Sequence, residues 1–346
     1  INKDFVQVYN NQGIIFRKLK DFDKSLRYLK TAIELNPNYF EAYNNIGNTL
    51  NDIGKKEKAI ENYKKAIELN PKYLDAYLNI GTAYQEIKKY DDAKKNFQKV
   101  KEIDPYYNFI NGKLLHLNMN MCDWKNYDQD IKFVENSVKI KNITDPFLFL
   151  SVSDDQIIQK KIAENYVKKF HTTKKVNILK IKGVNPKIAY FSPDFANHPV
   201  LHLMKDTFKN HDKERFDIYG YSFGLKSKDE AHFDIKKNFK SFNYIDNVSD
   251  KDVGIMCRNI GIDIAIDLCG HTAENRLGVF SERVSNIQIN YLGYPGTLGA
   301  DFMDYIIADK HVIPRDYHHK YTEKVLYLPN CYQSNPSEDI VSDKKL

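Results

Sequence analysis

The stretch Asn290-Tyr291-Leu292-Gly293-Tyr294-Pro295-Gly296-Thr297-Leu298-Gly299 lies at the end of an apolar, strand-like run, 286–291. A glycine-rich turn after a strand lets backbone N–H groups approach a ligand, because no Cβ stands in the way. Two other stretches also follow short apolar runs: Phe191-Ser192-Pro193-Asp194-Phe195-Ala196-Asn197-His198-Pro199 and Asp267-Leu268-Cys269-Gly270-His271-Thr272. Open α/β sheets bind ligands where their strands end, so we interpret the three loops as parts of one site.

The region around these loops alternates between strand-like and helix-like patterns. Helices are predicted over 200–208, 229–239 and 250–259, and strands over 187–191, 216–221, 241–244, 262–268, 287–291, 305–308 and 325–327. Such alternation predicts a Rossmann-like lobe with a parallel, doubly wound sheet over 186–346. A G-x-G-x-x-G fingerprint is missing from the sequence, so we do not expect a standard nicotinamide-binding domain.

The first third of the chain is a repeat array with a period of 34 residues. This spacing separates Gly13, Gly47 and Gly81, and it also separates Pro37, Pro71 and Pro105. The same register holds small residues at 25, 59 and 93 and large ones at 29, 63 and 97, and its next column holds Ala32, Ala66 and Val100. This is the tetratricopeptide period, so residues 1–108 are predicted to form an α-solenoid.

An asparagine recurs on the first helix of each repeat, at Asn11, Asn45 and Asn79. The first helices line the concave face of such a solenoid. Carboxamides there can both donate to and accept from an extended peptide backbone, so we predict an acceptor-peptide ladder. The alternative is that asparagine is merely tolerated on an exposed helix face.

Residues 109–185 keep a helical pattern without the repeat, which predicts capping and connecting helices. Ser153-Asp154-Asp155 is a typical helix start before the apolar run that leads to Phe170. Asp128-Gln129-Asp130 has a metal-binding form, but it falls on a helix flank, where solvated carboxylates are the simpler interpretation. We therefore expect no metal site.

Composition narrows the class of protein further. The 346 residues carry a net charge of +6 without a Lys/Arg block, so nucleic acid is not expected as a partner. The four cysteines show no zinc or disulfide spacing. A membrane span and a signal peptide are also missing from the pattern, so a cytoplasmic location is predicted. Because the chain begins with Ile1 and has a polar end at 334–346, we expect it to be a fragment of a longer protein.

Taken together, these segments resemble the family of protein O-GlcNAc transferases and SPINDLY proteins, which are two-lobed, GT-B-type glycosyltransferases. The resemblance covers nearly the whole chain, in the family's order. It rests on the repeat array and on Cys122-Asp123-Trp124, Ser192 to Pro199, Gly270-His271-Thr272, Leu292 to Thr297, Tyr321-Thr322-Glu323-Lys324 and Tyr327-Leu328-Pro329.

The resemblance implies an inverting, metal-independent transfer of N-acetylglucosamine from UDP-GlcNAc to Ser or Thr hydroxyls of proteins, with no cofactor. It implies that the family's second, nucleotide-binding lobe is absent from this chain, so that the fragment alone is inactive. His198 matches the histidine of the family's Asn-His-Pro motif and is the candidate general base, or else a residue that only orients substrate. The candidate donor contacts are His271, Thr272, Gly293, Tyr294 and Pro295, while Asp194 either supports the loop or simply forms a turn.

Three hypotheses remain open from the sequence. The first is a protein O-GlcNAc transferase, with a GDP-fucose-dependent protein O-fucosyltransferase of the SPINDLY type as its close variant. Gly270-His271-Thr272 occurs on the SPINDLY side of the family, whereas the form of 293–297 is associated with GlcNAc transfer. The second is a non-catalytic tetratricopeptide scaffold that binds peptides. The third is a truncated product whose α/β lobe exposes an apolar face.

Overall fold

The computed structural model describes residues 3–140, 142–174, 176, 185–224 and 229–336. The chain divides into two compact units, Ile1–Thr144 and Asp145–Leu346. The division falls inside the stretch predicted as capping and connecting helices. Its first two helices therefore belong to the first unit, and its last two belong to the second.

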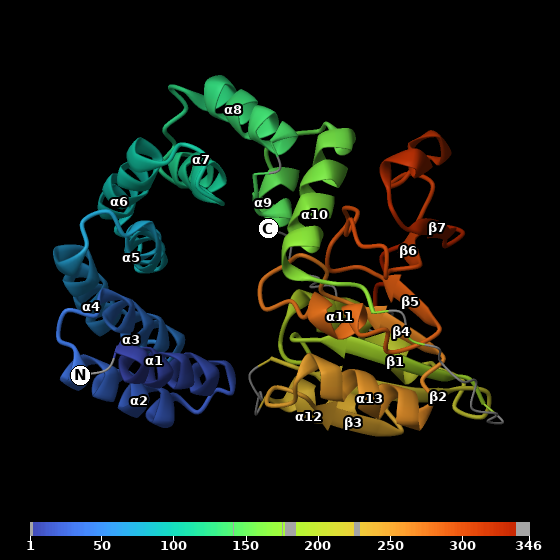
Figure 1. Cartoon of the computed structure of the whole chain (residues 1–346). Coiled ribbons are helices and arrows are strands. Elements are labelled where there is room, and N and C mark those ends of the chain that lie inside the picture. Colours follow the sequence, from blue (N-terminus) through green and yellow to red (C-terminus); the bar gives the residue numbers. More distant parts are fainter. Residues whose placement is uncertain (1–2, 141, 175, 177–184, 225–228, 337–346) are drawn as a thin grey trace, which may run out of the picture. The chain divides into compact units, whose positions relative to one another are not determined.

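The first unit consists of helical hairpins, as the repeat period predicts (Figure 1). Its helices are α1 (Lys3–Lys18), α2 (Phe22–Leu35), α3 (Phe40–Asp52), α4 (Lys56–Leu69), α5 (Leu74–Glu86), α6 (Tyr90–Ile103), α7 (Ile110–Asn120) and α8 (Tyr127–Lys139). The second helix of each repeat ends two residues before Pro37, Pro71 and Pro105, because proline cannot continue a helical ladder.

The regular spacing of glycines and large residues corresponds to direct contacts. A Cβ added to Gly47 would overlap the Tyr63 ring, and one added to Gly81 would overlap the Phe97 ring. Gly13 faces Leu29 in the same way. The glycine thus lets the two helices of a hairpin approach until the large side chain fills the space between them, which confirms the predicted columns.

Contacts in the array run between consecutive hairpins. Each first helix packs against its own partner and also against the first helix of the next repeat, as α1 does with α3 and α3 with α5. Side-chain hydrogen bonds reinforce this stacking, for example from Ser25 Oγ to Thr49 Oγ1 (3.0 Å).

The second unit begins with α9 (Pro146–Leu150) and α10 (Gln156–Phe170). Asp155 caps α10 by accepting from the backbone N–H groups of Ile157 and Ile158, as the sequence predicts. A seven-stranded sheet follows, in the order β3-β2-β1-β4-β5-β6-β7 with every pair parallel. The strands are β1 (Lys187–Ser192), β2 (Asp217–Ser222), β3 (Ser241–Tyr244), β4 (Ile264–Asp267), β5 (Ile287–Asn290), β6 (Tyr305–Ala308) and β7 (Lys324–Tyr327).

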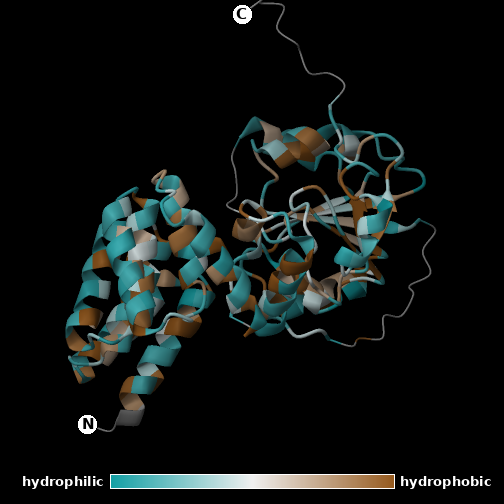
Figure 2. Ribbon diagram, turned by 90° about the horizontal axis from the view of Figure 1, so that it is seen from above, coloured by the Kyte–Doolittle hydropathy of each residue, from teal (hydrophilic) through white to brown (hydrophobic). Residues whose placement is uncertain are grey.

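Helices cover both faces of the sheet. On one face, α11 (Pro199–Lys209) and α12 (Glu230–Lys236) bury Tyr190, Phe208 and Ile266. On the other, α13 (Asp250–Ile260) and α14 (Leu277–Ser281) bury an apolar cluster that includes Phe191. Figure 2 shows hydrophobic residues along the central strands. The predicted doubly wound fold is therefore confirmed. A short 3₁₀ helix, η1 (Arg315–Lys320), precedes β7.

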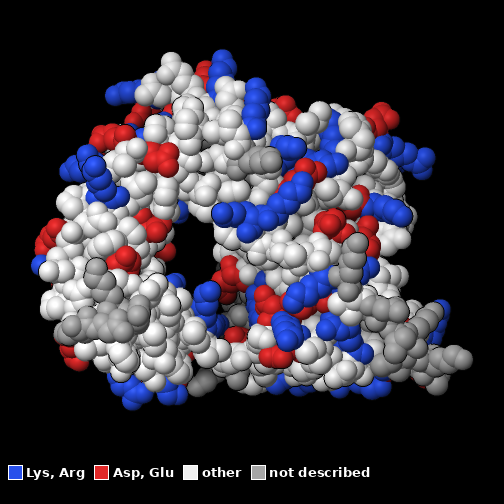
Figure 3. Space-filling model, in the orientation of Figure 1, with Lys and Arg blue, Asp and Glu red and all other residues white. Residues whose placement is uncertain are grey.

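Charged side chains of both signs are interspersed on the face drawn in Figure 3, in keeping with the nearly balanced composition. No helix in the described part of the chain combines the length and apolarity that crossing a bilayer demands.

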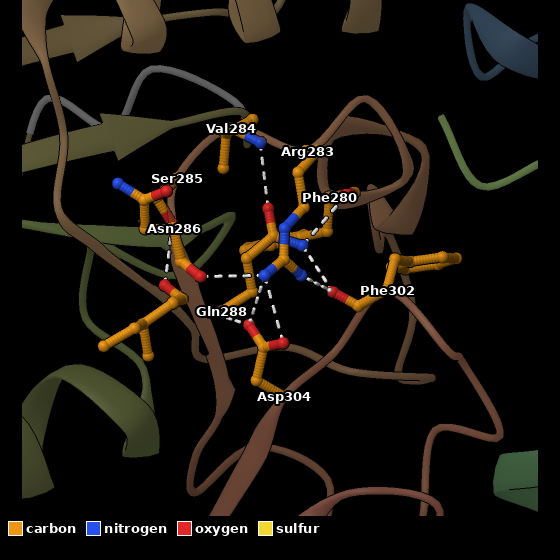
Figure 4. A network of polar contacts seen from close by, with 9 residues as sticks. Phe280, Arg283, Val284, Ser285, Asn286, Gln288, Phe302 and Asp304 are labelled. Atoms are coloured by element: carbon orange, nitrogen blue, oxygen red, sulfur yellow. Dashed lines mark hydrogen bonds and ion pairs between the residues drawn. The ribbon is translucent and has the colours of Figure 1, made fainter. Parts of the chain in front are cut away.

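A polar network fixes the chain where it enters β5 and β6, at the amino ends of these strands (Figure 4). The Gln288 side chain, fully buried, donates to Phe280 O (3.0 Å) and Phe302 O (2.6 Å) and accepts from Val284 N (2.9 Å). Arg283 donates to Phe302 O and pairs with Asp304 at 2.9 Å. One side chain amide therefore satisfies three buried backbone groups.

Gln288→Ala should lower the free energy of unfolding by about 2 kcal/mol, because Val284 N would lose its partner, while Phe280 O and Phe302 O would each keep only their hydrogen bond from Arg283. Urea denaturation of the purified chain measures the loss. Asn286→Ala is the control, since the Asn286 side chain is exposed and only its backbone carbonyl joins the network. Equal stability of both variants would contradict the role given to Gln288.

Candidate active site

The strand order places a topological switch point between β1 and β4. β1 pairs with β2 on one side and with β4 on the other, so the chain leaves these two neighbouring strands in opposite directions along the sheet. In doubly wound sheets this arrangement opens a crevice at the carboxyl ends of the strands. The stretch 191–199 forms the loop after β1, the stretch 267–272 forms the loop after β4, and the stretch 290–299 follows the adjacent β5.

The loop after β1 leads directly into α11 and carries His198. His198 is the N-cap residue of α11, and Pro199 occupies the first helical turn, as predicted from Asn-His-Pro. The His198 Nδ1 atom accepts from Val200 N at 3.3 Å and lies 3.7 Å from Asp194 Oδ2. The side chain is about half exposed, so its other ring nitrogen can meet a ligand.

The two neighbours of Nδ1, Val200 N and Asp194 Oδ2, favour different tautomers of His198. An N–H donor such as Val200 N needs a lone pair on Nδ1, which leaves the proton of a neutral ring on Nε2. The Asp194 carboxylate would instead favour a proton on Nδ1 and a free lone pair on Nε2. Burial raises the pKa of Asp194, His198 opposes the rise, and Glu274 adds to it. Only the second tautomer presents a proton acceptor to the crevice.

Residues of α12 and its N-cap bind the backbone of the loop after β1. Its N-cap, Asp229, accepts from Asn197 N (3.0 Å). The buried ring of His232 bridges two segments, since Nδ1 bonds Phe195 O (2.6 Å) and Nε2 bonds Tyr244 OH (2.6 Å). Sequence analysis did not single out either residue. Their partners lie more than ten residues away in the chain, so no local pattern could have indicated them.

The loop after β4 folds around the buried carboxylate of Asp267. Its oxygens accept from Cys269 N (3.0 Å) and Gly270 N (3.1 Å). Burial raises the pKa of Asp267 to about 6, against these two hydrogen bonds. Gly270 has a positive φ of 62°, and an added Cβ would overlap Tyr294. The carboxylate therefore shapes a tight turn that only glycine fits.

His271 and Thr272 point into the protein rather than outward. His271 is only 5% exposed, its Nε2 bonds Leu298 O (2.8 Å), and its ring meets the rings of Tyr166 and Tyr294 edge-on. Burial lowers the pKa of His271 to about 4. Thr272 donates to Cys269 O at 2.9 Å. Both side chains are therefore engaged within the loops, although Nδ1 of His271 has no hydrogen-bond partner among the described residues.

The loop after β5 packs directly onto the end of β4. A Cβ on Gly293 would overlap Leu268 O, so the two backbones touch only because residue 293 has no side chain. Tyr294 is 2% exposed and tilts against Phe147 of α9, whereas Pro295 is exposed. Of the three predicted donor contacts in this loop, Gly293 and Pro295 are reachable from solvent as the structure stands.

The three loops form one group. The charges of Asp267, Asp194 and Glu274 add to the burial that raises the pKa of the Cys269 thiol, so the loops after β1 and β4 are neighbours. The loops after β4 and β5 touch through Gly293 and Gly270. α10 also contacts them, through Tyr166 and through its backbone beside Gly299. The connecting helices therefore cover the loops, which the sequence did not suggest.

The asparagine column lies in the first unit and has partners of its own. Asn45 Nδ2 donates to Asn10 Oδ1 (2.8 Å), and Asn79 Nδ2 donates to Asn44 Oδ1 (3.0 Å). Asn11 is exposed, and Asn45 and Asn79 are half-buried. Each of the latter two side chains thus links the first helices of successive repeats.

Among the described residues, no group of three His, Cys, Asp or Glu side chains is arranged to hold a metal ion. Asp128-Gln129-Asp130 lies on α8, with Asp128 exposed and Asp130 3.8 Å from Lys101 Nζ.

Comparison with known families assigns both units. Tetratricopeptide models match residues 6–39, 28–61, 47–88 and 74–107. The model described as "Glycosyl transferase family 41" matches residues 121–339, well over half of the chain. The chain belongs to glycosyl transferase family 41. The candidate crevice is thus part of a family 41 domain that follows a tetratricopeptide array.

Curated relatives of this family 41 chain come from plants and animals. It is 34% identical over 149 residues to the probable UDP-N-acetylglucosamine–peptide N-acetylglucosaminyltransferase SEC of Arabidopsis thaliana, covering 43% of this chain and 15% of that one. It is 36% identical over 153 residues to the UDP-N-acetylglucosamine–peptide N-acetylglucosaminyltransferase of Caenorhabditis elegans, and the match covers 43% of this chain and 13% of that one. It is 32% identical over 148 residues to the probable UDP-N-acetylglucosamine–peptide N-acetylglucosaminyltransferase SPINDLY of Arabidopsis thaliana, and the match covers 42% of this chain and 16% of that one. The chain therefore matches only a minor part of each relative's length.

Among solved structures, a mutant O-GlcNAc transferase of Thermobaculum terrenum has a similar fold. The TM-score is 0.60 at 18% sequence identity, and the match covers 98% of this family 41 chain and 60% of the other. At this identity the likeness concerns the fold: helical repeats followed by a parallel sheet.

Proposed function

We propose that the full-length protein transfers N-acetylglucosamine from UDP-GlcNAc to Ser or Thr hydroxyls of proteins, with inversion and without a metal. This chain would supply the acceptor-binding array and the first of two GT-B lobes, in the cytoplasm, while a second lobe would bind most of the nucleotide. The observation that carries the proposal is the convergence of the loops after β1, β4 and β5 at the switch point of a family 41 domain.

The chemistry needs one proton acceptor, because a hydroxyl is a poor nucleophile near neutral pH. In the proposed step the acceptor oxygen bonds to the anomeric carbon while that carbon's bond to the nucleoside diphosphate breaks. The hydroxyl proton passes to His198 Nε2. Asp194, 3.7 Å from Nδ1, supports this assignment because its carboxylate favours the tautomer with a free Nε2 lone pair.

GDP-fucose is the second candidate donor. Gly270-His271-Thr272, the form found on the SPINDLY side of the resemblance, favours it, whereas the form of residues 293–297 favours GlcNAc. Full-length protein should be incubated with each labelled nucleotide sugar and a mixture of acceptor proteins, and transfer followed by mass spectrometry. Transfer from UDP-GlcNAc alone supports the proposal, and transfer from GDP-fucose alone selects the alternative. If neither sugar is transferred while acceptor peptides still bind, the protein is a scaffold.

The combined Asn45→Ala and Asn79→Ala variant should weaken the binding of long protein acceptors about 30-fold and that of short peptides much less. Only a long acceptor would extend along the array, and each amide would contribute on the order of 1 kcal/mol. Dissociation constants for a protein and for a short peptide cut from it provide the measurement. Asn62→Ala on α4 is the control, because its side chain bonds Lys58 O within its own helix. Equal weakening of both ligands would argue against the ladder.

A further inference from the structure

A second buried carboxylate, that of Glu323, lies directly before β7 and faces the loop after β5. Glu323 is 3% exposed. It accepts from Thr297 Oγ1 (2.7 Å), Leu298 N (2.7 Å) and Thr322 Oγ1 (3.0 Å). The described residues provide it with no cationic partner, and burial raises its pKa. Burying a carboxylate in this way is costly, which indicates that its hydrogen bonds hold the groups that it contacts in a required position.

Leu298 connects this carboxylate to His271. Its N–H is bound by Glu323 Oε1, and its carbonyl oxygen is bound by His271 Nε2 at 2.8 Å. The next residue, Gly299, has a φ of 66° and touches the backbone of α10 so closely that a Cβ would overlap it. The Leu298 carbonyl is therefore held in place by Glu323 on one side and α10 on the other.

A fixed carbonyl decides the tautomer of His271. A carbonyl oxygen can only accept, so Nε2 must carry the proton, and the neutral ring then has a bare lone pair on Nδ1. This Nδ1 is buried and has no hydrogen-bond partner among the described residues. An unsatisfied buried acceptor costs on the order of 1–3 kcal/mol, which a bound hydroxyl group would recover.

We propose that Glu323 is a positioning residue that acts through Leu298 to hold His271 in the Nε2–H tautomer, so that Nδ1 accepts a hydrogen bond from a sugar hydroxyl of the nucleotide donor. The identity of the ligand rests on the proposed function. The positioning of His271 by Glu323 does not, and it can be tested without any transfer reaction.

The experiment is ¹⁵N NMR of the histidine rings in the full chain, with His271→Gln used to assign the signal. The unchanged protein should show one tautomer of His271 from pH 8 to about pH 5, because burial holds its pKa near 4. Glu323→Ala should give a mixture of tautomers and protonation at a higher pH. If Glu323→Ala does not fold, Glu323→Asp takes its place, because the shorter side chain keeps the charge but moves it away from Leu298 N. Glu323→Asp should show a smaller admixture of the second His271 tautomer and a smaller rise in the pH of protonation. Glu282→Ala is the matched control, because Glu282 pairs with Lys174 (2.8 Å) instead.

Unchanged His271 signals in a folded Glu323 variant would overturn the positioning role. Saturating UDP-GlcNAc or GDP-fucose should shift the Nδ1 signal of the full-length protein, and Glu323→Ala should raise KM for the donor about tenfold with a smaller change in kcat. If neither sugar shifts Nδ1 in a protein that does transfer, the ligand part is wrong. If no sugar is transferred but the tautomer depends on Glu323, the proposed function fails and the positioning role stands.

Discussion

Replacing His198 with alanine in the full-length protein is expected to lower kcat by about 10²- to 10⁴-fold, the usual contribution of a general base. Binding of acceptor proteins should change little, because the array that would hold them lies in the other unit. Steady-state kinetics with a peptide acceptor, together with a separate binding measurement, test both parts.

The control for this variant is His202→Ala. His202 lies one turn further along α11, is exposed, and bonds Asn197 Oδ1 (2.8 Å), so its loss should cost much less activity. Asp194→Asn adds a mechanistic check. If His198 accepts the proton on Nε2, removing the carboxylate beside Nδ1 should also slow turnover strongly. If His198 instead donates from Nε2, Asp194→Asn should have little effect, and unchanged turnover in His198→Ala would remove it from the mechanism.

Gly293→Ala is expected to lower kcat/KM about 100-fold, because displacing an active-site loop by about 1 Å is enough to cost that much. The added Cβ would overlap the carbonyl oxygen of Leu268, a backbone atom that cannot rotate away. The loops after β4 and β5 must therefore separate, and the His271–Leu298 contact would be disturbed as well.

Pro295→Ala is the matched change in the same loop, and because Pro295 is exposed it should leave the loops in contact. Thermal unfolding of both variants separates loop displacement from global unfolding. Full activity in Gly293→Ala would mean that the close approach of the two backbones has no bearing on the reaction.

Periodic features of the fold could be predicted from the sequence because they are local and repeated. The 34-residue register identified which glycine faces which large side chain, as Gly47 and Tyr63 show. Short apolar runs identified the seven strands, and their ends identified the candidate loops. Asn-His-Pro indicated the start of α11, since histidine can cap and proline suits the first turn.

What the sequence could not supply was the direction of side chains within those loops. His271 and Tyr294 occur in a motif that suggests ligand contact, yet both are buried, because α9 and α10 fold over the loops. The contact between Glu323 and Leu298 spans 25 residues and depends on β7 lying at the edge of the sheet. No local pattern encodes such a partner.

The hairpins of the first unit interlock mainly with their immediate neighbours, whereas the seven strands of the second share one continuous ladder of backbone hydrogen bonds. Mechanical tension applied along the chain would therefore be released in two regimes. The array would extend elastically and then unfold one hairpin at a time, while the sheet would unfold cooperatively as one unit. Bending of the array by itself would leave the backbone ladder of the sheet unchanged.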